Sequence, residues 1–166
     1  MNSVLAGLVI ALSIGFGNAV FGAPEQDGKE KAAVAVAEKW LAVVDDGDYA
    51  ESWKQAAAYF RKAVTREEWE KAAEAAREPF GRMVSRTLKS ADFTTSAPGV
   101  PDGEYVIIRF ETEFEHKKSA VETITPMRDE EGKWRVSGYY IRRRFAGTRL
   151  DFGFDFLFWS QWAGIM

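Results

Sequence analysis

EYVIIRFETEFE, residues 104–115, is the stretch that decides the fold. Its side chains alternate between two classes. One face carries four apolar residues and a threonine: Val106, Ile108, Phe110, Thr112 and Phe114. The other face carries the charged residues Arg109, Glu111, Glu113 and Glu115. Because successive side chains of a strand point to opposite faces of a sheet, this stretch predicts a strand with one buried face.

Three further strands are predicted around it. Residues 82–96 are rich in Thr, Ser, Val and Phe, residues 120–128 follow a turn at 116–119, and residues 133–142 follow a hairpin loop at 129–132. We expect one face of the last strand to carry Trp134, Val136, Gly138 and Tyr140. The opposite face is expected to carry Arg135, Ser137 and Tyr139. Short turns between neighbouring strands favour an antiparallel sheet.

Upstream of the strands, apolar residues recur at three- and four-residue spacing, which is typical of amphipathic helices. The first such stripe consists of Ala33, Val36, Ala37, Trp40, Leu41 and Val44. The second follows Asp48, a residue type that caps helices, and consists of Tyr49, Trp53, Ala56, Ala57 and Phe60. The third opens with the capping-box pattern of residues 65–68, contains Trp69, and ends at Pro79 and Gly81.

Helices followed by strands predict an α+β fold, with three amphipathic helices packed on one face of a four-stranded antiparallel sheet. The aromatic residues on the helix stripes would be covered by that sheet. We therefore interpret them as core residues: Trp40, Tyr49, Trp53, Phe60 and Trp69.

The N-terminal segment is typical of a secretory signal peptide. Residues 4–16 form an apolar run, small residues follow it, and no charged residue precedes Glu25. We expect cleavage after Ala19 or Gly22 and export to the periplasm or the medium. The expected organisation is a signal peptide at 1–22, a linker at 23–30, the folded domain at 31–144 and a C-terminal extension at 145–166. An uncleaved anchor is the alternative, because residues 4–23 could just span a thin bilayer.

Composition excludes several chemistries. The 166 residues include no cysteine and one histidine, with a formal net charge of −3. Without cysteine there is no disulfide and no thiol nucleophile. His116 lies alone in a predicted charged turn, which favours neither a metal site nor a Ser-His-Asp site. The small, mixed charge does not favour nucleic acid as a partner. We expect no cofactor and no metal.

Three segments together resemble a known family. They are AEKWLAVVDDGDYAESW at 37–53, YVIIRFETEF at 105–114 and WRVSGYYI at 134–141. As a set they resemble the exported bacterial proteins grouped as domain of unknown function family 4019, over roughly residues 31–142. The resemblance implies a periplasmic or secreted domain with a nuclear-transport-factor-2-like or cystatin-like fold. It implies no catalytic residue, because none is defined for the family.

The chain departs from the family after Arg142. Arg142, Arg143 and Arg144 lead into a segment with phenylalanine at every second position from Phe152 to Phe158, followed by two tryptophans. That alternation suits a fifth strand paired to the fourth. A basic cluster followed by aromatic residues also suits contact with a membrane or a partner protein. An extension without function is the remaining alternative.

Two functional hypotheses follow. The leading one is a non-catalytic module of the cell envelope that binds a small molecule or a protein. Its candidate pocket or surface residues are Tyr105, Trp134, Tyr139 and Tyr140. The alternative is a small pocket enzyme of the cone-shaped α+β type with an Asp/Tyr acid-base pair, in which Asp92 would be the base and a tyrosine the proton donor. A buried carboxylate bonded to a buried tyrosine in an open cavity would favour the enzyme. A cavity filled by Trp and Phe side chains would favour a binding or structural role.

Overall fold

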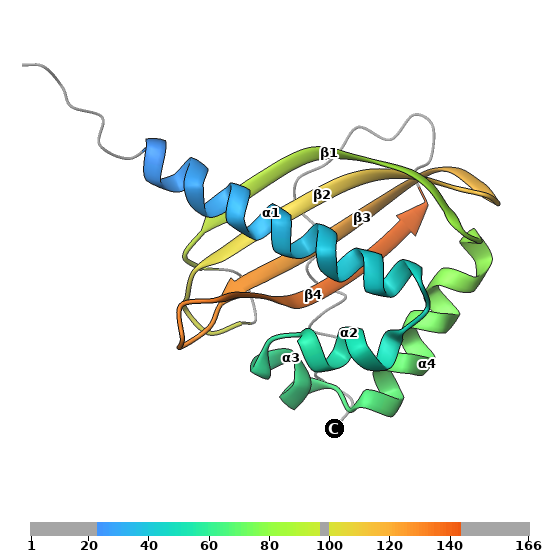
Figure 1. Ribbon diagram of the computed structural model, residues 1–166, viewed down its shortest axis with the longest axis horizontal. Coiled ribbons are helices and arrows are strands. Elements are labelled where there is room, and N and C mark those ends of the chain that lie inside the picture. Colours follow the sequence, from blue (N-terminus) through green and yellow to red (C-terminus); the bar gives the residue numbers. More distant parts are fainter. Residues whose placement is uncertain (1–22, 97–99, 144–166) are drawn as a thin grey trace, which may run out of the picture.

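Helices come first along the chain and strands afterwards, as predicted (Figure 1). The computed structural model describes residues 23–96 and 100–143. Its helices are α1 (Ala23–Asp45), α2 (Tyr49–Gln55), α3 (Ala58–Ala63) and α4 (Arg66–Arg77), followed by the 3₁₀ turn η1 (Glu78–Phe80). Strands β1 (Met83–Thr94), β2 (Tyr105–Phe114), β3 (Lys117–Arg128) and β4 (Trp134–Arg143) form one antiparallel sheet in the order β1-β2-β3-β4. The α+β class is confirmed. The predicted signal peptide and fifth strand lie outside the described residues.

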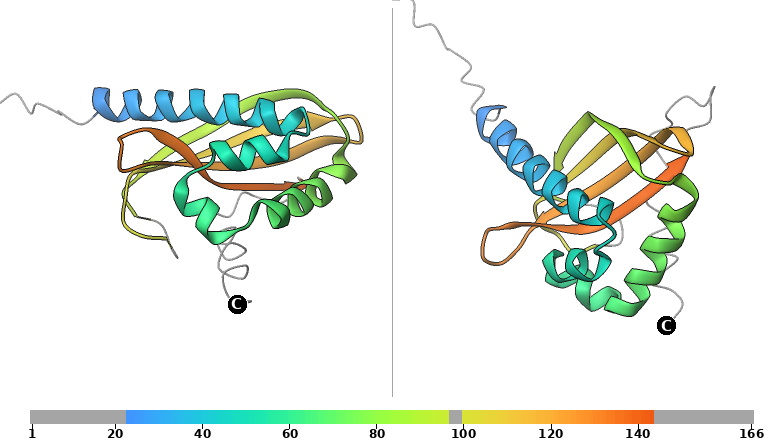
Figure 2. Two further views of the ribbon diagram at one scale, coloured as in Figure 1. Left: turned by 60° about the horizontal axis from the view of Figure 1, so that its bottom comes forward. Right: turned by 45° about the vertical axis from the view of Figure 1, so that its right-hand side comes forward.

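Strand β2 has the two faces that its sequence predicts. Its even-numbered residues from Val106 to Phe114 are all buried. Helix α1 lies over this face and contacts all four strands (Figures 1 and 2). Against the sheet α1 buries Ala33, Ala37, Trp40, Leu41 and Val44. The two alanines let the helix backbone approach the strands closely, because a methyl group is all that separates them.

Helix α1 begins earlier than the sequence predicts. The expected polar linker at 23–30 instead forms the first turns of α1, which starts at Ala23. Proline is accepted in a first turn because its missing N–H would have no partner there, and Pro24 stands at that position. Glu25 adds a negative charge near the helix N-terminus, where it is favourable. Gly28 lowers helix propensity but does not end the helix.

The predicted second helix is broken in two. Ala56 and Ala57 adopt extended backbone conformations between α2 and α3. The Ala57 N–H leaves the helical pattern and donates to the Val136 carbonyl of β4 at 2.8 Å. Two indole groups bond to backbone carbonyls in this region: Trp40 Nε1 donates to Ser52 O of α2 at 2.8 Å, and Trp53 Nε1 donates to Val64 O, just after α3, at 2.9 Å. Tertiary bonds therefore override the local helical preference.

Helix α4 is capped as predicted. The Thr65 hydroxyl accepts the Glu68 N–H at 3.3 Å, and the Glu68 carboxylate accepts the Thr65 N–H at 2.9 Å. After η1 the chain turns into β1 at Gly81, whose φ of +76° is rarely adopted by other residues. A Cβ at this position would also lie 3.0 Å from Nδ1 of His116. The predicted end of the helical region at Pro79 and Gly81 is thus confirmed.

Strand β4 changes face part-way along. Thr125 pairs with Gly138 and Pro126 pairs with Val136, so Ser137 is an extra residue, a β-bulge. The Ser137 hydroxyl donates to the Thr125 carbonyl at 2.7 Å. Beyond the bulge the alternation shifts by one residue. Tyr139, not Tyr140, lies on the helix-covered face, so the predicted facing of Gly138, Tyr139 and Tyr140 is wrong.

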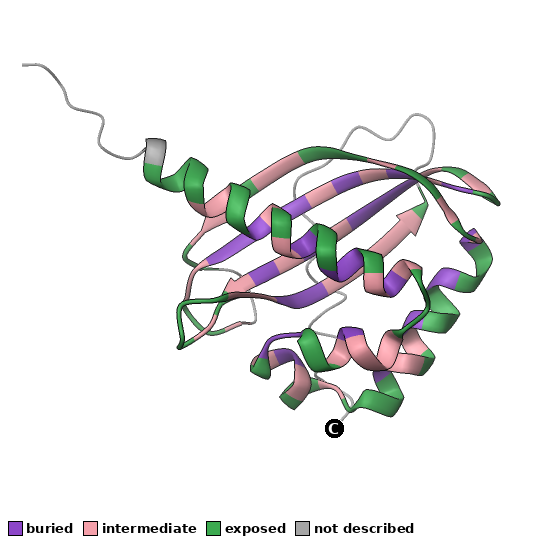
Figure 3. Cartoon of the chain, viewed as in Figure 1, coloured by how far each residue is buried: buried purple, intermediate pink, exposed green. Residues whose placement is uncertain are grey.

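The core lies between α1 and the sheet and continues under the short helices at the β4 edge (Figure 3). Helices α2 and α4 contact each other, and α3 contacts β4. The Trp69 ring meets Trp40 at 5.8 Å and Phe60 at 5.1 Å between centroids. These three rings are buried, while Tyr49 and Trp53 are partly buried against the same cluster. The helix aromatics are core residues, as the sequence predicts.

Candidate functional site

Four ionisable side chains meet inside the protein. Asp45 ends α1, Arg77 ends α4, Arg86 lies on β1 and Glu122 lies on β3. Glu122 has no exposure to solvent, and Arg77 is 6% exposed. Arg77 reaches the interior because it stands four residues after the buried Ala73, on the same helix face. Together these residues are called the charge cluster.

Both oxygens of Glu122 are used within the cluster. Oε1 accepts hydrogen bonds from Arg77 at 3.0 Å and from the Tyr139 hydroxyl at 2.8 Å. Oε2 accepts from Arg86 at 2.8 Å and from the Thr112 hydroxyl at 2.6 Å.

Asp45 binds the same two guanidinium groups from the other side. It accepts from Arg77 at 2.5 Å and from Arg86 at 2.7 and 3.0 Å. Two cations thus face two anions, and every member is hydrogen-bonded.

The surroundings shift the pKa values of the basic and phenolic groups. Burial acts to lower the pKa of Arg86, but its hydrogen bonds and charge interactions with Asp45 and Glu122 outweigh burial and raise it. The pKa of Arg77 is likewise raised, against burial, by Tyr139, Glu122 and Asp45. Burial, followed by the Glu122 carboxylate, raises the pKa of Tyr139 well above its ordinary value.

Glu122 and Tyr139 form a bonded carboxylate–tyrosine pair, which is one of the two features expected for a pocket enzyme. The other expected feature is an open cavity around the pair. The Glu122 carboxylate is buried, and it accepts a hydrogen bond from the hydroxyl of Tyr139, which is partly buried. Aromatic rings, however, occupy the space around the pair: Tyr139 lies 5.6 Å from Trp40 and 6.2 Å from Trp69 between centroids, and Arg77 lies over Phe114. Because four donors occupy both carboxylate oxygens, no oxygen is left to take a substrate proton. The geometry is that of a structural network.

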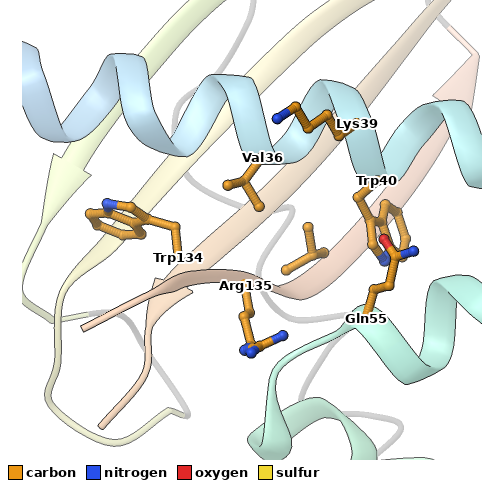
Figure 4. Close-up of a pocket in the computed structure, with 7 residues that line it drawn as sticks. Val36, Lys39, Trp40, Gln55, Trp134 and Arg135 are labelled. Atoms are coloured by element: carbon orange, nitrogen blue, oxygen red, sulfur yellow. The ribbon is translucent and has the colours of Figure 1, made fainter. Parts of the chain in front are cut away.

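An open pocket lies elsewhere, between α1, the end of α2 and the first residues of β4 (Figure 4). Its volume is about 190 Å³. It is lined by Val36, Lys39, Trp40, Gln55, Trp134, Arg135 and Val136. The valines and tryptophans make its inner surface apolar, and Lys39, Arg135 and Gln55 supply polar groups at its margins.

The two cations of the pocket differ in their partners. Arg135 donates to Asp129 at 2.8 Å, which offsets much of its charge. Lys39 is exposed and forms no ion pair with the residues that the structure describes. The Glu51 carboxylate on α2 accepts hydrogen bonds from Gln55 at 3.1 Å and from Lys54 at 3.3 Å, so its charge is offset by Lys54 and not by Lys39. Lys39 is therefore the uncompensated charge beside the apolar pocket.

The residues that the sequence singles out fall in different places. Trp134 lines the pocket, and Tyr139 belongs to the charge cluster. Tyr105 is buried, and its hydroxyl donates to the Pro101 carbonyl at 2.7 Å. Tyr140 lies on the face of β4 opposite Tyr139, and the bulge makes Tyr140 the one that faces away from the helices. The structure does not bring the four together.

The candidate base Asp92 lies on the edge strand β1. It is exposed, and it accepts a hydrogen bond from Arg109 at 3.2 Å. No tyrosine is among its partners in the described part of the chain. The predicted Asp/Tyr pair based on Asp92 is therefore not formed, and the carboxylate beside a tyrosine is Glu122 instead.

Neither the cluster nor the pocket offers a metal site. Within residues 23–96 and 100–143, no group of three or more His, Asp or Glu side chains is arranged to hold a metal ion. His116 is exposed beside Gly81 in the β2–β3 turn, as its sequence context predicts.

Comparison with known proteins agrees with the fold. A family described as "Protein of unknown function (DUF4019)" matches residues 36–139. This chain belongs to the DUF4019 family. The match covers α1 from its middle to Tyr139, so it includes the charge cluster and the pocket of this DUF4019 chain. No curated protein matches the chain.

One solved structure, from Catenulispora acidiphila, is similar in fold. The two sequences are 10% identical, with 71% of this DUF4019 chain and 93% of the other chain covered, at a TM-score of 0.50. At that identity the likeness shows a shared fold and nothing about activity.

Replacing Glu122 by Gln should destabilise the protein by about 3–5 kcal/mol, because two buried guanidinium groups would then share one carboxylate. Urea unfolding followed by circular dichroism measures the change. Glu111→Gln is the matched control, since its partner Lys89 is 52% exposed and such surface pairs contribute below about 1 kcal/mol. Equal effects of the two substitutions would contradict the role of the cluster.

Tyr139 should make the protein sensitive to alkali. Its pKa is raised above 10.0 in the folded state, so its contribution to stability is complete below pH 10.0 and declines as the pH rises beyond it. Unfolding free energies between about pH 9 and 11 should fall less steeply in Tyr139→Phe than in the wild type. Tyr140→Phe, on the other face of β4, is the control and should keep the wild-type slope. Parallel slopes in all three proteins would disprove the effect.

Proposed function

We propose that this DUF4019 chain is a non-catalytic binding module of the cell envelope, which recognises a peptide or protein segment at the pocket between α1 and β4. The observation that supports this most is the combination of an apolar pocket with the uncompensated charge of Lys39 at its margin. Apolar area supplies affinity, and a single placed charge supplies orientation.

The size of the pocket favours a side chain over a whole small molecule. Ligand pockets for drug-sized molecules measure roughly 300–1,000 Å³. The pocket here, at about 190 Å³, is smaller. A pocket below that range suits one large side chain better than a whole drug-sized molecule. A segment that inserts one apolar residue would fill it.

The charge at the margin favours an acidic neighbour in that segment. Lys39 is exposed on α1, above the apolar surface made by Val36 and Trp134 (Figure 4). A carboxylate beside the inserted residue would meet this ammonium group, whereas a basic residue would be repelled. The motif expected in a ligand is therefore one large apolar residue next to Asp or Glu.

The enzyme alternative has less support from the geometry. That alternative rests on Glu122 and Tyr139, whose hydrogen bonds are made to each other and to neighbouring side chains. The pocket, in turn, is lined by no carboxylate and no tyrosine of the residues that the structure describes. The acid-base residues and the open space are therefore in separate places.

Peptides selected from a random phage-displayed library on the full chain should be enriched in the apolar-acidic motif. Calorimetric titration of the best peptide should show a dissociation constant about tenfold or more higher for Trp134→Ala and for Lys39→Glu, because each removes one element of recognition. Lys31→Glu makes the same charge change elsewhere on α1 and should leave the affinity unchanged.

The proposal fails if the selected peptides share no such motif. It also fails if Lys39→Glu and Lys31→Glu bind equally well, since the pocket would then not be the site. Lys39 is exposed, so its substitution tests recognition without disturbing the fold.

We further propose that the chain is exported, on the basis of its uncharged, apolar N-terminal segment. Expression with a C-terminal epitope, followed by cell fractionation and N-terminal sequencing, tests this. The product should appear in the periplasm or medium and begin after Ala19 or Gly22. A full-length product in the cytosol would refute export, and a full-length product in the membrane would support the anchor alternative.

A further inference from the structure

The outer edge of β4 already carries one main-chain bond from outside the sheet. Strand β4 pairs with β3 on one side, and the sheet order β1-β2-β3-β4 makes its other side an edge. At that edge the Val136 carbonyl accepts the Ala57 N–H at 2.8 Å. Ala57 has an extended backbone between α2 and α3, so it stands where a residue of a further strand would stand. This edge therefore accepts hydrogen bonds from an extended segment.

The same bond fixes which main-chain groups of β4 point outward. In an antiparallel pair, residues bonded to the neighbouring strand alternate with residues whose N–H and C=O point away from it. The Val136 carbonyl points away from β3, so Trp134, two residues earlier, presents its N–H and C=O at the outer edge as well. The register of β3 agrees. Trp134 pairs with Arg128, whose own N–H points to the other side of β3 and donates to the Glu104 carbonyl at 2.9 Å.

The outward N–H and C=O of Trp134 form no hydrogen bond with residues 23–96 and 100–143. Unpaired edge groups of this kind are a template for pairing with another chain. The free edge is short. The hairpin bounds it on one side, where the Asp129 N–H donates to the Lys133 carbonyl at 2.8 Å, and Ala57 bounds it on the other side at Val136. It therefore suits a short extended peptide better than a full strand of a second copy of this chain.

The free edge borders the pocket between α1 and β4. Trp134 and Val136 line that pocket with their side chains, and Trp134 also holds the outward main-chain groups. Both side chains lie on the helix-covered face of β4, across from Val36 and Trp40 of α1 (Figure 4). A strand added at this edge would point every second side chain to the same face. One of those side chains would enter the pocket beside Trp134.

We infer that the peptide ligand binds as an added β-strand, with its main chain bonded to the N–H and C=O of Trp134 and one apolar side chain in the pocket. The inference rests on the proposed function, because it takes the pocket as the peptide site and specifies the conformation of the bound segment. In strand addition, main-chain bonds supply affinity and alternate side chains supply specificity. The uncompensated charge of Lys39 commits the occupant to a segment that carries a carboxylate. A helical segment is excluded by this mode, since its main-chain groups bond within the helix.

Amide hydrogen exchange of the full chain, resolved by NMR, tests the edge with the tightest peptide from the selection described above. In the free protein the Trp134 N–H should exchange rapidly, whereas the N–H of Arg135, which points to β3, should be protected. With saturating peptide, exchange at Trp134 should slow by about tenfold or more, because its N–H gains a hydrogen bond. Equal protection of the two amides in the free protein would overturn the free edge. An unprotected Trp134 amide in the complex would overturn strand addition.

N-methylation of the same peptide, one residue at a time, tests the main-chain bonds from the ligand side. Methylation of the residue that donates to the Trp134 carbonyl should raise the dissociation constant about tenfold or more, because one hydrogen bond is lost. The two flanking residues are the matched controls, since their N–H groups point away from β4 and should tolerate methylation. Equal losses at all three positions would overturn strand addition. The pocket would still stand in that case if Trp134→Ala and Lys39→Glu weaken binding, whereas the absence of any binding peptide would defeat both proposals.

Discussion

Burying a carboxylate costs several kcal/mol unless cations and hydrogen-bond donors surround it. Glu122 has no exposure, and α4 and β1 each bring a guanidinium group to one of its oxygens. The hydroxyls of Thr112 and Tyr139 complete its set of donors. Asp45 at the end of α1 then balances the second positive charge. The ends of two helices and the middle of the sheet must therefore take their positions together. Loss of one partner would leave a buried charge uncompensated, whereas apolar residues of similar volume can replace one another at a smaller cost.

The same network determines where function can reside. An α+β fold of this kind has space between its helices and its sheet that could hold a ligand. Here that space contains the charge cluster, the rings of Trp40 and Trp69, and Tyr139 between them. A network with every partner satisfied is rigid and has no bond to offer to a ligand. The surfaces, and above all the pocket beside β4, remain as places for recognition.

Much of the fold could be predicted from the sequence, because apolar periodicity and turn residues report local structure. β2 and the capping box at Thr65 were predicted by such signals. The charge cluster was missed, although Glu122 between Ala120 and Ile124 interrupts an apolar face. A charge on a buried face signals a buried partner without saying which residue it is. The bulge at Ser137 was missed as well, although Gly138 beside it and Pro126 opposite are residue types that mark bulges within strands.

The course of β4 relates the pocket to the charge cluster. Trp134 at the first residue of β4 lines the pocket, and Val136 lines it too while its carbonyl accepts the Ala57 N–H at 2.8 Å. The bulge at Ser137 follows directly and turns Tyr139 towards the helices, where its hydroxyl donates to Glu122. One strand therefore presents apolar residues to the pocket before the bulge and a hydroxyl to the charge cluster beyond it.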